Sequence, residues 1–208
     1  MNVFGNIRNI VTAALIGVSM SVSAQKFEFF NPDSDRSYTK GSVLQLRTNL
    51  LHDAVLCPNI GLEVQIENGL AWQFDYGEAW WNSFDKNKFY SVIYFQTEIR
   101  KYFGKWSYVG PDRGHHIGVY IQMGAFDLEN GGNGYISPEL DNNVGVGISY
   151  GYSFRLNNRL SIDCTLGAGY ASSIYEGYIP VGKRYVSTGW RKKTWIGTTM
   201  VEALLVCV

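Results

Sequence analysis

After its first residues this sequence has no long apolar run: beyond Val22, nothing approaches the roughly 18 continuous apolar residues of a membrane-spanning helix. Charge is also scarce, at 17% of residues where about a quarter is usual. The formal net charge is zero, so no basic excess indicates nucleic acid and no acidic excess indicates cation storage. These absences exclude a helical membrane protein and argue against a nucleic-acid partner.

Cysteine is rare as well. The three cysteines, Cys57, Cys164 and Cys207, form no C-x-x-C pair. A disulfide framework or a zinc site would need even or closely spaced thiols. The sequence therefore predicts no metal and no cofactor.

What the chain does contain is alternation, most clearly from Val144 to Phe154. Every second residue there is large and apolar, and the residues between are Gly or Ser. Side chains of a strand point alternately to opposite faces, so one face is apolar with aromatic ends and the other is nearly bare. Together with 15% aromatic residues, this is typical of a strand in a membrane-spanning β-barrel.

The N-terminus has the features of a secretory signal peptide. Arg8 precedes an apolar run from Ile10 to Val22, and Val22-Ser23-Ala24 supplies the small residues that signal peptidase requires. The run is shorter than the roughly 20 residues of a spanning helix. We expect a signal peptide at 1–24, a periplasmic leader at 25–41 and one domain at 42–208.

Alternating segments after residue 41 predict eight strands. These are Ser42–Leu51, Asn59–Ile66, Leu70–Gly77, Phe89–Phe103, His116–Asp127, Val144–Phe154, Leu160–Tyr170 and Thr194–Val208. Asn68-Gly69 is the type I′ dipeptide of a tight hairpin. The fold expected is all-β, an eight-stranded antiparallel up-and-down transmembrane β-barrel.

Loop lengths predict the topology of this barrel. Connections alternate between short and long, as in outer-membrane barrels, whose periplasmic turns are tight and whose extracellular loops are longer. The long loops expected outside are Leu51–Pro58, Glu78–Lys88, Leu128–Asn142 and Ala171–Lys193. The termini should then lie in the periplasm, and the predicted location is the outer membrane.

Charged residues fall in the register opposite the apolar one. An eight-stranded barrel has an interior just wide enough for side chains, so we expect these residues to form an internal network of ion pairs that closes the lumen. His115 and His116 are expected to be interfacial anchors near the periplasmic turn. The predicted interior network consists of Arg47, Glu63, Asp75, Glu98, Arg100, Asp163 and Glu202.

Several segments resemble a known family. They are the stretch from Leu46 to Ala54 ("LRTNLLHDA"), the stretch from Cys57 to Glu63 ("CPNIGLE"), the stretch from Glu98 to Phe103 and the stretch from Gly147 to Tyr152. These resemble the DUF3575 family of exported Gram-negative proteins, a domain of unknown function interpreted as an outer-membrane β-barrel. The resemblance implies fold and location rather than an activity. The final strand departs from it, since Val208 stands where a terminal aromatic is common.

Two sets of residues are candidates for a site. His52 and Asp53, at the edge of the first outer loop, are weak catalytic candidates, because hydrolysis needs a His beside a nucleophile and an orienting acid. Aromatic and cationic side chains of the outer loops are candidates for binding protein, glycan or lipopolysaccharide phosphates. This second set consists of Trp80, Trp81, Tyr135, Tyr178 and Arg191.

The function predicted is a non-enzymatic outer-membrane scaffold that displays surface loops, with a structural or adhesive role in the cell envelope. Its expected partners are outer-membrane lipid, lipopolysaccharide and a surface or fimbrial protein, with no nucleic acid. Two alternatives stay open at this point: a lipid-modifying hydrolase that uses His52, and a soluble exported barrel that binds an apolar ligand.

Overall fold

The computed structural model describes residues 44–66, 69–83, 88–103, 114–156, 160–181 and 184–207. Almost all of them are in β-strands, apart from a short helix, α2 (Leu50–Ala54), a 3-10 turn, η3 (Leu140–Asn142), and the connections. The predicted all-β, antiparallel fold is confirmed. The predicted signal peptide and leader lie outside the described residues. In the part that is described, no helix is long and apolar enough to cross a membrane.

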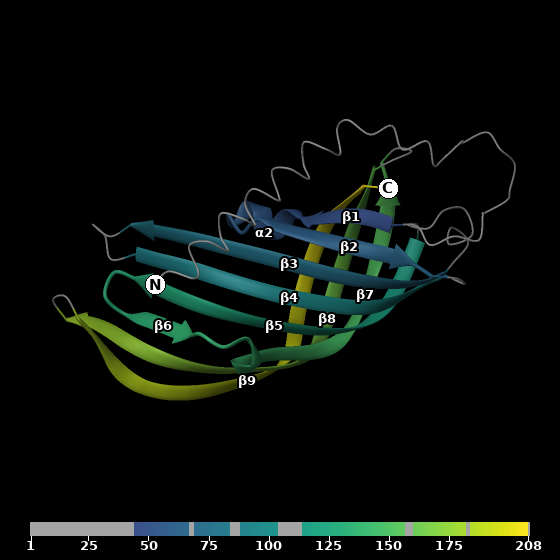
Figure 1. Cartoon of the computed structure of the whole chain (residues 1–208). Coiled ribbons are helices and arrows are strands. Elements are labelled where there is room, and N and C mark those ends of the chain that lie inside the picture. Colours follow the sequence, from purple (N-terminus) through teal and green to yellow (C-terminus); the bar gives the residue numbers. More distant parts are fainter. Residues whose placement is uncertain are drawn as a thin grey trace, which may run out of the picture. The chain divides into compact units, whose positions relative to one another are not determined.

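The strands form one ring-like sheet (Figure 1). Eight of them follow one another around the ring in the order β1, β2, β3, β4, β5, β7, β8, β9, and β9 pairs back onto β1. The strands of the described residues are β1 (Leu44–Asn49), β2 (Asn59–Gln65), β3 (Leu70–Ser83), β4 (Lys88–Phe103), β5 (Gly114–Asn130), β6 (Gly134–Ser137), β7 (Asn143–Arg155), β8 (Leu160–Val181) and β9 (Arg184–Cys207).

Two of the predicted long loops are instead largely strand. The segment 171–193 is the far part of the β8–β9 hairpin, whose pairing runs from Ala171 opposite Trp195 to Val181 opposite Arg184. Likewise β3 and β4 continue through most of 78–88. The loop predictions were wrong because glycines and polar residues interrupt the alternation there, whereas each strand still satisfies the backbone groups of its neighbour. A bulge at Gly177/Tyr178 absorbs one interruption.

The other two predicted loops also contain ordered elements. In 128–142, strand β6 pairs with the end of β5 and with β8, and so extends the wall above β7. In 51–58, helix α2 occupies the start of the connection, so the first strand ends at Asn49 rather than Leu51. The Asn49 side chain accepts a hydrogen bond from the Leu51 amide at 3.1 Å, which caps the helix.

Side-chain alternation divides the ring into an inner and an outer face. Arg100 and Glu63, on the inner face, have no exposed surface, whereas Val119 and Ile148, on the outer face, are 63% and 62% exposed. The charged register therefore lies inside the ring and the apolar register lies outside.

The bare face of β7 makes room for large side chains from β5. A Cβ atom at Gly147 would lie 2.5 Å from the Tyr120 hydroxyl, and one at Gly151 would lie 2.5 Å from the His116 ring. At Gly145 it would meet the Gln122 amide at 2.7 Å. Glycine is thus required where a neighbouring strand projects a long polar side chain across the narrow interior.

Candidate functional site: the polar interior and its mouth

The interior of the ring is organised around two buried arginines, and Arg47 of β1 is the first. Its guanidinium forms an ion pair with Glu63 of β2 and donates to Gln73 Oε1 at 2.8 Å. It also donates to the Tyr102 hydroxyl at 3.1 Å, and that hydroxyl donates in turn to Glu63 at 3.1 Å. Strands β1 to β4 are therefore linked through one fully enclosed charge.

Arg100 of β4 is the second centre and reaches further around the ring. Its Nε lies 2.9 Å from Glu98 Oε1, and its Nη2 lies 3.1 Å from Glu202 Oε2 of β9. Its Nη1 is 3.7 Å from Asp163 Oδ2 of β8. Because these strands lie far apart in the sheet order, Arg100 cross-links opposite walls through the lumen.

His116 also belongs to this interior, contrary to its prediction as an interfacial anchor. It is fully buried, and its Nε2 lies 2.9 Å from Asp163 Oδ2. His115 faces outward, where its ring stacks on Phe103 and Tyr150, each at a centroid separation of 5.9 Å. The parity of β5 could have identified His116, because it shares a register with Gly118 and Tyr120, both on the inner face.

The structure places all seven predicted network residues inside the ring, each at most 6% exposed. Six of them form ion pairs with one another, and Asp75 accepts a hydrogen bond from Gln73 Nε2 at 2.5 Å. The carboxylates are Glu63, Asp75, Glu98, Asp163 and Glu202, against the guanidiniums of Arg47 and Arg100. This part of the interior, which we call the closed half, is thus rich in carboxylate.

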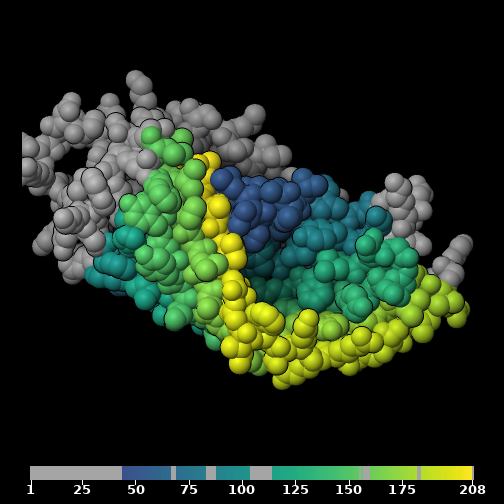
Figure 2. Space-filling model, turned by 180° about the vertical axis from the view of Figure 1, so that it is seen from behind, coloured from purple at the N-terminus to yellow at the C-terminus, as the bar shows by residue number. Residues whose placement is uncertain are grey.

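The ring of strands is complete only as far as Asn49 of β1 and Asn59 of β2. Only Leu46 to Asn49 pair with β9, opposite Leu204 to Cys207, so the rest of β9 has β8 as its single strand neighbour among the described residues. Figure 2 shows the molecule hollowed between β9 (yellow) and the segment of β1 and α2 (purple-blue). We call the segments that extend beyond this closure the mouth: β3 from Glu78, β4 up to Ile93, β5 from Gly124, β6, β8 from Ala171 and β9 up to Gly197.

A pocket of about 500 Å³ opens at the mouth, bordered by the ends of β3, β4, β5 and β6. Aligned pairing places Trp81, Tyr90, Leu128 and Tyr135 in one row across these strands, on the inner face. Lys88, Asn130 and Asn133 border the same pocket. Its volume lies within the range of small-ligand sites.

Charge is sorted by face in the mouth. On the inner face stand Lys88, Arg184, Arg191 and Lys193, and none of the described strand residues there is a carboxylate. The outer face carries the mouth's acids, Glu78, Asp127, Glu129 and Glu176, together with Lys192. The inner surface is therefore carboxylate-rich in the closed half and cationic at the mouth.

The structure separates the five predicted surface-binding residues. Trp81 and Tyr135 line the pocket, and Arg191 lies on the inner face of β9, opposite Tyr175 of β8. Trp80 faces outward and packs edge-on against Phe89 at 5.6 Å. Tyr178 also faces outward, where its hydroxyl donates to Asp127 at 2.6 Å. All five lie in the mouth, but only three of them, Trp81, Tyr135 and Arg191, share its inner face. Sequence reasoning missed Tyr90, which also lines the pocket.

His52 and Asp53 do not bond to each other. His52 Nδ1 lies 2.6 Å from the Tyr94 hydroxyl, while Asp53 accepts from Thr48 at 2.8 Å and from Asn59 at 2.9 Å. Burial lowers the pKa of His52 below its ordinary value, outweighing the opposite influence of the Asp53 carboxylate. These contacts fasten α2 to the ring at the boundary between the closed half and the mouth.

Within the described residues, no group of three or more His, Cys, Asp or Glu side chains is arranged to hold a metal ion. No curated protein and no solved structure is similar enough to this chain to count as a match. One family model, described as a protein of unknown function (DUF3575), matches residues 11–208. The resemblance seen in the sequence is thereby confirmed, and the chain belongs to the DUF3575 family.

Proposed function

We propose that this chain is an outer-membrane β-barrel of a Gram-negative cell envelope, exported by its N-terminal signal peptide. It acts as a non-enzymatic scaffold with a closed polar interior, and it presents the mouth to the outside in a structural or adhesive role. One observation carries the proposal: the register exposed around the ring is apolar, while the arginines and carboxylates of the same strands are enclosed.

The dimensions of the apolar face support this proposal. On β7 it runs from Val144 to Phe154 and on β8 from Leu160 to Tyr170, about 11 residues each, and a tilted strand needs about 9–11 to cross a bilayer. Aromatic rings form a band at the edge of this face that lies near the start of β5 and the end of β7, around His115, Tyr152 and Phe154. Such bands resemble the aromatic girdles of membrane barrels. Lys101, on the outer register of β4, stands two residues from the end of its strand, where a charge costs little.

The contacts favour this scaffold over the two alternatives. A hydrolase would need His52 oriented by an acid, whereas its hydrogen-bond partner is Tyr94. A soluble carrier of an apolar ligand would need an apolar cavity, whereas the centre of this ring holds ion pairs. A structural or adhesive role requires only the stable wall and an exposed mouth.

The test is heat-modifiable gel migration of the membrane fraction, combined with trypsin treatment of intact cells. We expect a band that shifts on boiling and surface cleavage in the β8–β9 hairpin, between Lys183 and Lys193. A matched variant in which every Lys and Arg of that stretch is Gln should shift on boiling but lose the cleavage in this hairpin. Recovery of the protein in the soluble periplasmic fraction, without a heat shift, would overturn the proposal.

A further inference from the structure

The pocket at the mouth is bounded by aromatic faces and amides. Trp81, Tyr90 and Tyr135 contribute rings from the inner face, and Asn130 and Asn133 contribute side-chain amides at the edge. Phe89 and Asn82, from the outer register, add a further ring and a further amide to its border. Flat rings pack against the C–H faces of sugars, and amides bind hydroxyl groups as both donor and acceptor. This combination suits a saccharide better than a wholly apolar ligand.

The aromatic surface continues beyond the pocket toward β8. The Tyr135 ring meets Tyr175 edge-on at a centroid separation of 5.7 Å, and Tyr175 in turn lies 6.5 Å from Phe126. Tyr175 is the cross-strand partner of Arg191, and such pairs have Cβ atoms about 5 Å apart. Pocket, aromatic surface and cation thus form one continuous inner surface.

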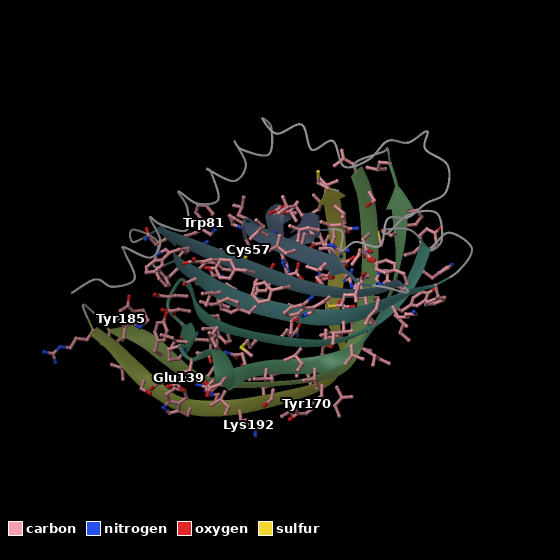
Figure 3. The ribbon with its side chains drawn as sticks, turned by 45° about the vertical axis from the view of Figure 1, so that its right-hand side comes forward. Cys57, Trp81, Glu139, Tyr170, Tyr185 and Lys192 are labelled. Atoms are coloured by element: carbon pink, nitrogen blue, oxygen red, sulfur yellow. The ribbon has the colours of Figure 1, made fainter. Side chains whose placement is uncertain are left out.

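Strand alternation determines which basic side chains face this inner surface. Arg191 and Lys193 of β9 lie on the inner face, whereas Lys192 between them lies on the outer face. Figure 3 shows Lys192 on the outward side of the β8–β9 ribbon, with Trp81 across the mouth from it. Arg184 of β9 lies on the inner face as well, and Lys88 adds an inner cation on the opposite wall. Glu129 also borders the pocket, but it alternates with Leu128 and Asn130 and so belongs to the outer register.

We propose that the mouth binds an anionic saccharide. Its sugar rings stack on Trp81 and Tyr135, and its phosphate, sulfate or carboxylate groups bind Arg191, Lys193 and Lys88 through charge-assisted hydrogen bonds. This inference rests on the proposed function, in which the mouth faces the cell surface. Binding is measured on detergent-solubilised protein, so its failure is distinguishable from failure of the membrane test.

The test is calorimetric titration of the full-length mature chain in detergent with four probes. Two are anionic saccharides from different sources: a heparin-derived hexasaccharide, and the phosphorylated core oligosaccharide released from lipopolysaccharide. The others are neutral maltohexaose and a six-nucleotide oligothymidylate. We expect one or both anionic saccharides to bind at least tenfold more tightly than either other probe, and the tighter one identifies the source.

Two neighbouring substitutions provide the matched control. Lys193→Ala removes an inner cation and should weaken binding by about tenfold or more, whereas Lys192→Ala removes the same charge from the outer face and should leave affinity unchanged. Trp81→Ala should weaken binding about as much as Lys193→Ala, and the heat shift of each variant shows that it is folded. Equal losses for Lys192→Ala and Lys193→Ala, equal binding of maltohexaose, or tighter binding of the oligonucleotide would overturn the proposal. So would the absence of binding by both anionic saccharides.

Discussion

The closed half and the mouth are built from several of the same strands, and their inner faces carry opposite charge. In the closed half, four of the five carboxylates form ion pairs with the two arginines, and the fifth, Asp75, accepts a hydrogen bond from Gln73. At the mouth, the inner face carries Lys88, Arg184, Arg191 and Lys193, and their side chains reach solvent. The contrast shows that strand alternation determines which face of the sheet a charged side chain occupies. Burial of that face then determines whether the charge needs an ion-pair partner within the protein.

Removal of an interior cation should have the largest effect. Arg100→Met leaves Glu98, Asp163 and Glu202 buried without their shared partner, which should cost about 3–5 kcal/mol of unfolding free energy. Arg191→Met at the mouth should change it by no more than about 0.5 kcal/mol. Urea unfolding in phosphatidylcholine vesicles, followed by the heat-shifted band, measures both. Equal losses would abolish the distinction between the two regions.

A charge introduced on the outer face distinguishes a wall that contacts lipid from one that contacts water. Ile148→Arg, in the middle of the apolar register of β7, should cost about 2–4 kcal/mol in vesicles, and Ile196→Arg, at the edge of the mouth, about 0–1 kcal/mol. The comparison uses the same urea titration. If Ile148→Arg were as stable as the unsubstituted chain, the outer face would not contact lipid.

Side-chain volume on the inner face tests packing. A Cβ at Gly118 would collide with the Glu98 carboxylate and lie 2.6 Å from Ser149 Oγ, so Gly118→Ala should cost about 1–3 kcal/mol. At Gly177 in the mouth, the close neighbour is the hydroxyl of one side chain, Thr188, which can rotate away. Gly177→Ala should therefore cost less, and an equal cost would mean that the mouth is packed as tightly as the closed half.

The boundary residue His52 should contribute a small dependence on pH. Its pKa is lowered in the folded state, so the unfolded chain takes up a proton first as the pH falls through the ordinary value near 6.5. Stability should then decline below pH 6.5, with the loss complete once the pH is below the folded pKa. His52→Gln removes this contribution. As the pH is lowered from 8 to 5, the free energy of unfolding of the His52→Gln variant should therefore rise relative to that of the unsubstituted chain. A constant difference would contradict burial of the imidazole.

Part of the fold could be predicted with simple rules. Period-two alternation placed Arg47, Glu98 and Arg100 on one face and Leu62 on the other, as the structure has them. The predicted hairpin between β2 and β3 is present, and Gly69 has a φ of +71°, while Asn68 lies outside the described residues. Its register differs from that of the two-residue turn predicted at Asn68-Gly69, because Gln65 pairs with Ala71 and the Ile66 amide donates to the Leu70 carbonyl. The faces of a strand and the need for a glycine with positive φ are local features, because they depend on adjacent residues alone.

The length of the strands and the side-chain neighbours at the mouth could not be predicted from local patterns. The segment 171–193 contains glycines and a proline that indicate a loop, yet it pairs along its length because β8 and β9 supply each other's hydrogen bonds. Strand pairing brings Tyr175 into contact with Tyr135, at a ring-centroid separation of 5.7 Å, and places it opposite Arg191. Tyr135 and Tyr175 are separated by tens of residues in the chain, so no local pattern predicts that they meet.

The sequence by itself determined the all-β class, the two faces of each strand and which charges share a face, because alternation is a property of the extended backbone. The tertiary structure alone decided which of those charges meet and where the ring closes. It also decided which aromatic and basic side chains gather at the open end. Those outcomes depend on register between distant strands, which the pairing of the whole sheet sets and no single segment encodes.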